Sequence, residues 1–559
     1  MSIGIVPEFV APGAGQWALD SSHYPGGTTP ISIWLMENAS RRGMAKMMTE
    51  LGVPAETLEV KFVNGFMYSR LRPLINADKT ATKLPPLPML KAVTRLHPKF
   101  RRARSMARKT LAERPWRRVI VEWHTTLRPQ LVRENCALGS FDLSAATNDE
   151  MASHLDALLT HLDCSFELHF YLHGFDLGPI GRYFLKCQQW GISLADAVES
   201  VKGTSPSTAA PAKEAAEIRA LLAQFETTPK TFEELRAMSP EIGERVDKYF
   251  EHRRASMVLR YDLDSPTLGE LPNLMLASIV TAADGVTTHA MLALANEVAA
   301  RLRDLVPGAD VALFDETLAE ARLALDLRDD NGPVTAEWPL GILRLAMLQA
   351  GTNLLASGRV MSAAHIFELH PHELAPMVRD GSGVSADELA RRATSRAEMA
   401  LIDAPKLLGP DPVEPPLAAL PPELAELVQM VQLVLSQLGL DGQPTGVGLS
   451  GVGVGDTAYR GIARQVRTAD DAADLIQPGD VIVVPFTSPT FNMILPLCGA
   501  IVTSNGGAMS HAAVMARELG IPAVVGAPGA LTDIPDGALI EVDPVSGCVT
   551  IIATDRRPD

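Results

Sequence analysis

The sequence predicts a multidomain α and α/β protein in which a large, mainly helical domain precedes a small domain of strands and helices. From about residue 90 to residue 401, apolar side chains recur at the i, i+3 and i+4 spacing of amphipathic helices. After about residue 440 the pattern changes to short β-branched runs broken by glycine, such as DVIVVPF and GCVTII. We therefore expect a helical domain over residues 1–403, a linker with one helix over 404–440 and the small domain over 441–559.

The two ends of the helical part differ from its middle. The first 75 residues look irregular and rich in Pro and Gly at first, and then helical from about Ile31 to Leu51. The stretch from Ala404 to Glu426 contains too many prolines for a helix interior and predicts a semi-rigid spacer. A helix from about Pro422 to Leu438 follows. A spacer ahead of a small domain is what that domain requires to swing between two sites.

Composition limits the kinds of partner. With 50 basic and 66 acidic side chains the net charge is -16, which argues against a general nucleic-acid-binding surface. One segment, from Lys91 to Arg118, is strongly basic, because it carries eleven Lys or Arg and only Glu113 as an acid. It predicts either solvated helices or a docking face for an acidic partner or for the phosphates of a nucleotide.

Cysteine spacing and hydropathy give further expectations. The five cysteines form no CxxC pair and have no histidine spacing suited to zinc, so we expect no metal site and a reducing compartment. The N-terminus lacks a basic region followed by an apolar core, and no run of about 18 apolar residues occurs. We expect a cytoplasmic protein without a membrane partner.

The most informative stretch is TSNGGAMSHAAVMARELGIPAVVG, from Thr503 to Gly526. A Gly-Gly turn delivers Ser510 and His511 to the start of a short Ala-rich helix, with Ser510 as its N-cap and Gly520 at its end. Unpaired backbone N–H groups favour an anion there. A neutral imidazole is a nucleophile near pH 7, so a phosphate carried on His511 is chemically sensible. The alternative is a polar residue that merely starts a helix.

This stretch resembles the phosphohistidine swivelling domain of the enzymes that use or make phosphoenolpyruvate, where a pattern like TxxGGxxSHxAxxAReLGIPAVVG surrounds the phosphorylated histidine. The resemblance covers about 24 residues closely and extends from about Gly446 to the end of the chain. It implies a small β/β/α swivelling domain with His511 as the phosphocarrier. It also implies a phosphate site formed by Gly506, Gly507, Ser510 and Arg517. Helix geometry leaves a surface or interdomain ion pair as the alternative for Arg517.

The order of the parts resembles the histidine-bearing subunit of phenylphosphate synthase, or rifampin phosphotransferase without its ATP-grasp domain. Segments such as WALDSSHYPGGTTP and RYDLDSPTLGELP are similar to parts of the central domains of these proteins. The chain ends soon after His511, so we do not expect the barrel that binds pyruvate in full-length relatives. The resemblance implies no tightly bound cofactor, a separate ATP-grasp subunit that brings ATP and Mg²⁺, and AMP and phosphate as the other products.

The implied acceptor is a small hydroxylated molecule in the helical domain. A phenol suits the reaction because its hydroxyl loses a proton more easily than an alcohol does. His173 precedes a glycine in YLHGFDLG, which favours an opening and makes it a candidate base, although it could equally be a satisfied helix-end histidine. The other polar candidates for the acceptor site are Arg260, Arg328, Asp329 and Asp330. Two alternative functions are a carrier or regulatory module without its own acceptor site and an antibiotic-inactivating phosphotransferase.

Overall fold

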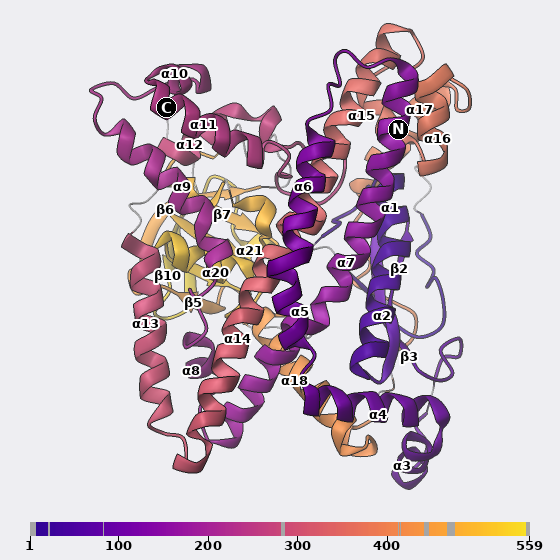
Figure 1. Ribbon diagram of the computed structural model, residues 1–559, viewed down its shortest axis with the longest axis vertical. Helices are drawn as coiled ribbons and strands as arrows, with labels where there is room; N and C mark the ends of the chain where they lie inside the picture. Colours follow the sequence, from indigo (N-terminus) through magenta and orange to yellow (C-terminus); the bar gives the residue numbers. More distant parts are fainter. Residues whose placement is uncertain are drawn as a thin grey trace. The chain divides into compact units, whose positions relative to one another are not determined.

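The computed structural model describes residues 7–20, 23–81, 83–280, 286–411, 413, 415–440, 446–466, 476–492 and 494–554. Contacts divide the chain into two compact units, each made of three separate stretches of sequence. Figure 1 shows the ribbon coloured along the sequence. Unit 1 comprises Met1–Phe175, Arg260–Asp264 and Val334–Val428, and unit 2 comprises Asp176–Leu259, Ser265–Pro333 and Gln429–Asp559. Helices predominate and a mixed sheet is formed by the C-terminal residues, which confirms the predicted fold class.

The helices of unit 1 include three π-helical segments, η1, η2 and η5, each continuous with α-helix. In chain order the helices are α1 (Pro30–Leu35), η1 (Met36–Ser40), α2 (Arg41–Leu51), α3 (Leu87–Leu96), α4 (Pro98–Glu113), α5 (Trp116–Glu122), η2 (Trp123–Leu127), α6 (Arg128–Gly139), the first part of α7 (Asn148–Gln189), η5 (Pro333–Glu337), α15 (Trp338–Ala356), η6 (Ala363–Glu368), α16 (Pro371–Asp380), α17 (Ala386–Ala400), η7 (Leu417–Ala419) and the first part of α18 (Pro422–Leu438). The helices predicted at 31–51 and 422–438 are thereby confirmed.

Unit 1 also contains a four-stranded antiparallel sheet that the sequence analysis missed. Its order is β2–β3–β1–β4, with β1 (Trp17–Leu19), β2 (Ala55–Val63), β3 (Phe66–Pro73) and β4 (Leu407–Leu408). The β2–β3 hairpin turns at Asn64 and Gly65, whose φ angles are 52° and 78°. Asn-Gly is a strong hairpin signal because a type I′ turn needs positive φ at both central residues. This signal was present in the sequence between two β-branched and aromatic runs.

The helices of unit 2 either precede its sheet in the chain or lie between the strands of that sheet. They are the last part of α7, α8 (Leu194–Glu199), α9 (Pro206–Leu222), α10 (Phe232–Ala237), α11 (Pro240–Arg253), η3 (Leu268–Glu270), α12 (Pro272–Val280), α13 (Val286–Arg303), η4 (Gly308–Asp310), α14 (Val311–Gly332), the larger, C-terminal part of α18, η8 (Pro489–Phe491), η9 (Leu495–Leu497), α20 (His511–Leu519) and α21 (Ala530–Asp533).

A seven-stranded mixed sheet forms the centre of unit 2, with the order β11–β10–β6–β7–β8–β9–β5. Its strands are β5 (Val452–Val454), β6 (Tyr459–Gln465), β7 (Val481–Val484), β8 (Ala500–Thr503), β9 (Ala523–Val525), β10 (Leu539–Asp543) and β11 (Cys548–Ala553). The four central strands β6 to β9 are parallel, whereas the outer pairs are antiparallel. The carboxyl ends of β7 and β8 therefore lie at the same edge of the sheet, where α20 begins.

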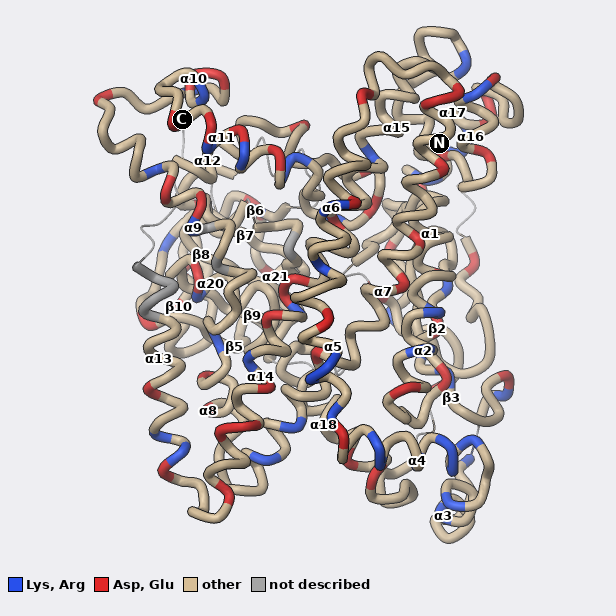
Figure 2. Tube along the Cα trace, in the orientation of Figure 1, with Lys and Arg blue, Asp and Glu red and all other residues tan. Residues whose placement is uncertain are grey.

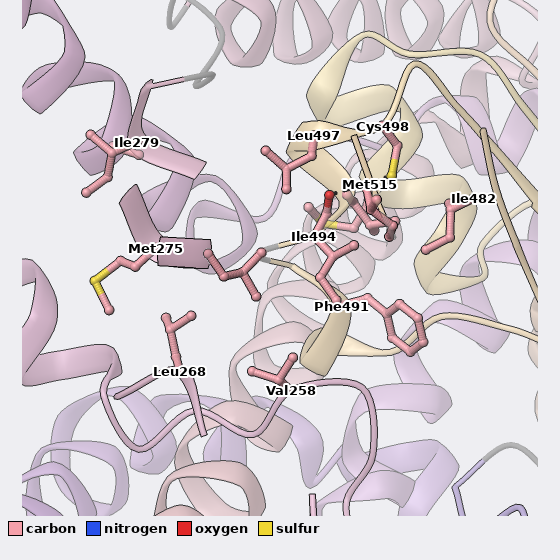
Figure 3. Packing of buried hydrophobic residues seen from close by; sticks show 14 of the residues in the cluster. Val258, Leu268, Met275, Ile279, Ile482, Phe491, Ile494, Leu497, Cys498 and Met515 are labelled. Carbon is pink, nitrogen blue, oxygen red and sulfur yellow. Dashed lines mark hydrogen bonds between the residues drawn. The ribbon is translucent and has the colours of Figure 1, made fainter. Parts of the chain in front are cut away.

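One apolar core joins α20 and the sheet to the helices α9–α12 of the same unit (Figure 3). Met275 and Ile279 of α12 belong to it together with Ile494, Leu497 and Met515, and all five side chains are buried. Burial of apolar surface is the main stabilising term in such contacts. The helix that begins at His511 is therefore anchored along its apolar face.

The basic segment forms α3, α4 and the start of α5 in unit 1, and Figure 2 shows its Lys and Arg residues along these helices. Arg104 and Arg108 both pair with Glu423, at 3.0 and 2.7 Å. Their hydrogen bonds lower the pKa of Glu423 to about 2. Part of the positive charge therefore has a structural partner, and the choice between solvated helices and a docking face stays a prediction.

Candidate functional site

His511 is the first residue of α20, as the sequence predicts. The extended N-cap residue Ser510 accepts a hydrogen bond from the backbone N–H of Ala513 at 3.4 Å, and Gly520 ends the helix with a φ of 67°. Both capping predictions are confirmed. The first N–H groups of a helix lack acceptors within it, so the helix start favours a negative group close to His511.

The Gly-Gly turn before the helix has a steric cause. Gly506 has a φ of 125°, which side chains rarely adopt. A Cβ atom on Gly507 would lie 2.5 Å from the carbonyl oxygen of Gln437, at the end of α18. The same carbonyl accepts a hydrogen bond from Met509 N at 2.7 Å. The turn is thus fastened to α18, and backbone of α18 lies directly beside Gly507. A role for these glycines in holding phosphate stays a prediction.

Two side chains hold the imidazole of His511. The Thr487 hydroxyl lies 2.8 Å from Nδ1, and the amide oxygen of Asn492 lies 2.8 Å from Nε2. Because an amide oxygen only accepts, Nε2 carries the ring proton in this arrangement and Nδ1 accepts from Thr487. Both residues follow β7, whose carboxyl end lies beside that of β8. Sequence reasoning missed them, although hydroxyl and amide residues directly after a buried strand were the available signal.

The imidazole is held in its neutral form. Desolvation, and then the positive charge of Arg328, lower the pKa of His511 to about 3. Its lone pair is therefore available throughout the physiological pH range, which a nucleophile requires. The expectation of a neutral imidazole near pH 7 was based on the unperturbed value, and the environment strengthens it.

Arg517 bonds to backbone in the structure. Its Nη1 donates to the carbonyl oxygens of Ala508 and Ala513, at 3.0 and 2.7 Å. These bonds tie α20 to the loop that precedes His511, because the long side chain runs back along the helix. Desolvation lowers the pKa of this guanidinium to about 10, while the charge of Glu199 acts in the opposite direction. Its predicted contact with phosphate stays a prediction.

Three of the acceptor-site candidates lie on α14, in the same unit as His511. Arg328 is half-buried and is the cation that acts on the imidazole. Asp329 accepts a hydrogen bond from the Thr208 hydroxyl at 2.7 Å, and desolvation raises its pKa. Asp330 is 5% exposed. The charge of Arg328 therefore relates the end of α14 to His511, whereas a role of these residues in an acceptor site stays a prediction.

The other two candidates lie in unit 1. Arg260 pairs with Asp264 at 3.1 Å. His173 lies on α7 with its ring 4.7 Å from that of His169, measured between centroids. A Cβ atom on the neighbouring Gly174 would lie 2.4 Å from the sulfur of Met47, so this glycine allows α7 to approach α2. Met47 therefore fills the space beside Gly174, whereas the opening expected at His173 and its role as a base stay predictions.

Glu518 is a further buried acid of α20, seven residues after His511. It is 7% exposed, its Oε2 has no hydrogen-bond partner, and desolvation followed by the charge of Asp329 raises its pKa to about 7. Residues seven apart lie on the same side of a helix. Glu518 therefore faces the side of α20 on which His511 lies.

Glu518 should make stability depend on pH. Its ordinary pKa is 4.5, so between pH 4.5 and 7 the folded state keeps a proton that the unfolded state loses, and stability falls as pH rises. Each pKa unit corresponds to about 1.4 kcal/mol, so Glu518→Gln should stabilise α20 at pH 8 by up to about 3 kcal/mol. Hydrogen exchange of α20 peptides at pH 5 and 8 measures this. Glu297→Gln, at an exposed acid of α13, is the control and should leave the difference between the two pH values intact. An equal difference in Glu518→Gln would contradict the assignment.

The described residues were also compared with the requirements of a metal site and of a membrane-spanning helix, and they meet neither. No group of three or more His, Cys, Asp and Glu side chains within the described ranges is arranged to hold a metal ion. None of the described helices combines the length and apolarity needed to cross a membrane.

Comparison with known proteins places the site in a family. Residues 476–547 match the PEP-utilising enzyme mobile domain, a stretch that contains Thr487, Asn492 and His511. The predicted resemblance to phosphohistidine domains is thereby confirmed, whereas the phenylphosphate synthase layout is not.

The curated relatives are longer proteins. An uncharacterized protein of Mycobacterium tuberculosis is 32% identical over 219 residues, which are 39% of this chain and 22% of the relative. The uncharacterized phosphotransferase YvkC of Bacillus subtilis is 29% identical over 211 residues, 38% of this chain and 24% of that protein. Phosphoenolpyruvate synthase of Aeropyrum pernix is 45% identical over 82 residues, 15% of this chain and 10% of the enzyme. The chain thus spans a quarter or less of the length of these relatives.

Proposed function

From the premise that residues 476–547 form a PEP-utilising enzyme mobile domain, we propose that this chain is a phosphotransferase component that carries a phosphoryl group on His511. The observation that carries the proposal is the imidazole itself, which is neutral, lies at the start of α20 and is held by Thr487 and Asn492. A phosphotransferase and a phosphoenolpyruvate synthase among the relatives support the same class of reaction.

The hydrogen bonds suggest how the ring becomes a nucleophile. If the ring proton moves from Nε2 to Nδ1, Nδ1 donates to the Thr487 hydroxyl, which can accept as readily as donate. The lone pair of Nε2 is then free to attack phosphorus once Asn492 releases it. The Asn492 amide group could turn its N–H toward a phosphoryl oxygen. Thr487 thus serves the ring in both states, and the helix start stabilises the negative charge.

We further propose the origin and destination of the phosphoryl group. The donor is ATP, bound with Mg²⁺ on a separate ATP-grasp subunit, and AMP and phosphate are the other products. The acceptor is the hydroxyl of a small, aromatic molecule. A phenol releases its proton more readily than an alcohol, so a weaker base in the protein is enough to deprotonate it.

The test is phosphate labelling. The purified chain would be incubated with Mg²⁺ and ATP labelled separately at the β- and γ-phosphates, with and without an ATP-grasp protein encoded by neighbouring genes. We expect acid-labile label on His511 only when the ATP-grasp protein is present, and loss of that label when phenol is added. Label on the chain alone would overturn the separate donor; retention with phenol would overturn the aromatic acceptor; and absence of label throughout would overturn the carrier role.

A further inference from the structure

Helices α6 and α7 of unit 1 border an open groove of about 620 Å³. Its lining comes from both helices and includes Gln130 and Glu134 of α6 together with Asp156, Thr160 and His161 of α7. All of these residues belong to one compact unit. The volume is within the range of sites that bind small molecules, and polar groups converge on it, as such sites require. A substituted phenol therefore fits the groove in size.

His161 lines this groove with one ring nitrogen held in place. Its Nε2 lies 2.7 Å from the amide oxygen of Asn135, which is fully buried. The amide nitrogen of Asn135 donates to the carbonyl oxygen of Val334 at 3.1 Å, so the amide oxygen is the atom directed at the ring. Because an amide oxygen only accepts, Nε2 carries the ring proton and Nδ1 keeps its lone pair. Val334 belongs to η5, and π-helical turns inside α-helices often occur at functional sites.

The lone pair of Nδ1 is suited to accept a proton. Within the described ranges no group makes a hydrogen bond to Nδ1, and the carboxylate of Glu134 lies 3.6 Å from it. Gln130 donates to the other oxygen of this carboxylate at 2.8 Å and so holds Glu134 beside the ring. Burial lowers the pKa of His161, and the charge of Glu134 acts in the opposite direction. The ring is therefore neutral at pH 7, and Glu134 would stabilise an imidazolium formed there.

The charge of the groove limits what it can bind. Among the described residues that line it are two acids, Glu134 and Asp156, and no Lys or Arg. A ligand that carries a carboxylate is repelled by these acids, whereas an uncharged or positively charged ligand is not. His173, the base expected from the sequence, is not among the described lining residues.

We propose that this groove binds the acceptor as an uncharged or positively charged phenol, and that Nδ1 of His161 takes the proton of its hydroxyl. The proposal rests on the carrier function described above, because the phosphoryl group arrives on His511. In the transfer, the bond between phosphorus and Nε2 of His511 breaks and its electron pair stays on that nitrogen. A new bond joins phosphorus to the phenol oxygen, whose proton passes to Nδ1 of His161. The resulting imidazolium lies beside Glu134 and returns the proton to water.

Binding to the groove can be measured without any phosphoryl transfer. The full, unphosphorylated chain, labelled with ¹⁵N at histidine, would be titrated with tyramine, ethylphenol and hydroxyphenylpropionate, which share a phenol ring and differ in the charge of the side group. We expect tyramine to bind at least about tenfold more tightly than hydroxyphenylpropionate and to shift the Nδ1 signal of His161. His161→Gln identifies that signal by its loss.

Asp156→Asn tests the selection by charge. Removing this exposed carboxylate should weaken tyramine binding by about threefold, because exposed charge pairs contribute little, and should leave ethylphenol binding unchanged. Asp149→Asn is the matched control, since Asp149 is also an exposed acid of α7 but does not line the groove.

The role of His161 as a base has its own readout. In the chain that already carries phosphate on His511, His161→Gln should slow transfer to ethylphenol by about 10²–10⁴-fold, the usual contribution of general base catalysis. Transfer to nitrophenol should slow much less, because its hydroxyl is more acidic and needs little help from a base. Glutamine keeps an N–H for Asn135, and His372→Gln on α16 is the matched control. Acid-labile phosphate on His511 should reach the normal level in both variants.

The outcomes separate this proposal from the carrier function. If hydroxyphenylpropionate binds as tightly as tyramine, or if none of the three phenols shifts the His161 signal, the groove is not the acceptor site. If His161→Gln slows transfer to nitrophenol as much as transfer to ethylphenol, or slows neither, His161 is not the base. If His511 never carries acid-labile phosphate, the carrier function fails, and the titrations still decide whether the groove binds phenols.

Discussion

Replacing His511 with alanine should abolish phosphoryl uptake and transfer, with a loss of at least about 10⁴-fold, as is typical when a covalent nucleophile is removed. Neither Thr487 nor Asn492, the two side chains that contact the ring, can take over, because a hydroxyl and an amide lack a nucleophilic nitrogen lone pair at neutral pH. The measurement is acid-labile ³²P on the chain and its intact mass under alkaline conditions.

The fold should survive this substitution. Alanine is a strong helix former, and Ser510 would still cap α20. The apolar face of the helix, including Met515, stays in its core. Far-UV circular dichroism and the thermal midpoint should therefore match the unmodified protein. His372→Ala is the matched control, since His372 is exposed on α16 and should retain full labelling. Normal labelling of His511→Ala would end the carrier assignment.

Helix α20 could be predicted from sequence because its determinants are local. Ser510, His511 and Gly520 lie within eleven consecutive residues, and each specifies the start or end of one helix through its own backbone preference. The partners of the imidazole could not be predicted in this way. Thr487 and Asn492 reach His511 because β7 and β8 pair in parallel, which is a consequence of the whole sheet.

The candidates for an acceptor site were harder to judge from sequence for a similar reason. Arg328 and Asp329 were named only as polar candidates, and their charges act on His511 and Glu518 because of the fold of unit 2, which local sequence does not show. Gly174 could not decide whether His173 faces an opening, because a glycine in a helix serves either an opening or a close helix contact, and sequence alone does not distinguish these. Here the contact is with α2.

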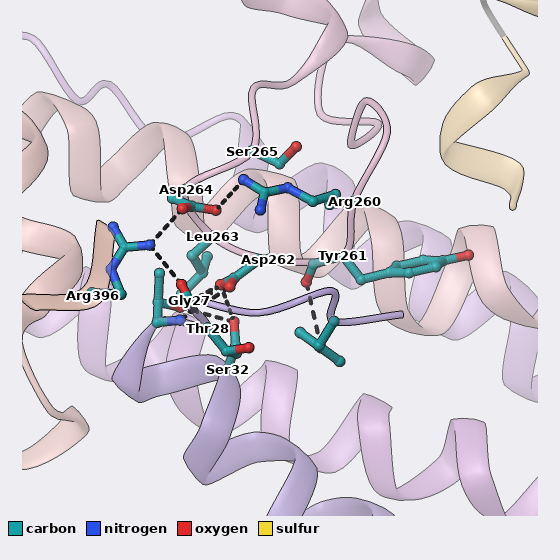
Figure 4. A network of polar contacts seen from close by, with 12 residues as sticks. Gly27, Thr28, Ser32, Arg260, Tyr261, Asp262, Leu263, Asp264, Ser265 and Arg396 are labelled. Carbon is teal, nitrogen blue, oxygen red and sulfur yellow. Dashed lines mark hydrogen bonds and ion pairs between the residues drawn. The ribbon is translucent and has the colours of Figure 1, made fainter. Parts of the chain in front are cut away.

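A second large effect is expected in unit 1, where the short segment Arg260–Asp264 is held by buried polar contacts (Figure 4). Asp262 is 3% exposed and accepts hydrogen bonds from the backbone N–H of Thr29 at 3.0 Å and from the Ser32 hydroxyl at 2.9 Å. Burial, and then the charge of Asp264, raise the pKa of Asp262 to about 6. Such a network is stable only while its charges are compensated.

Arg396 of α17 supplies much of that compensation. Its guanidinium lies 2.6 Å from Asp264 and 2.9 Å from Glu368, and it donates to the carbonyl oxygen of Gly27 at 2.8 Å. The side chain of Glu368 is 3% exposed, so solvent cannot replace the cation there. Asp264 would keep Arg260 as a partner, whereas Glu368 would lose its ion pair. Removal of Arg396 therefore leaves a buried carboxylate without its counter-charge.

Arg396→Met should lower the free energy of unfolding of unit 1 by about 3–5 kcal/mol, the usual effect of breaking a buried ion pair on one side. Arg391→Met on the same helix is the matched control, because Arg391 is 71% exposed and its pair with Glu388 should contribute less than about 1 kcal/mol. Five of the six tryptophans lie in unit 1, so urea unfolding followed by tryptophan fluorescence reports mainly on that unit. If Arg396→Met unfolds at the same urea concentration as Arg391→Met, the network does not hold the Arg260–Asp264 segment as described. Faster hydrogen exchange of peptides from α1 and α17 in Arg396→Met alone would show that the loss of stability lies at these contacts.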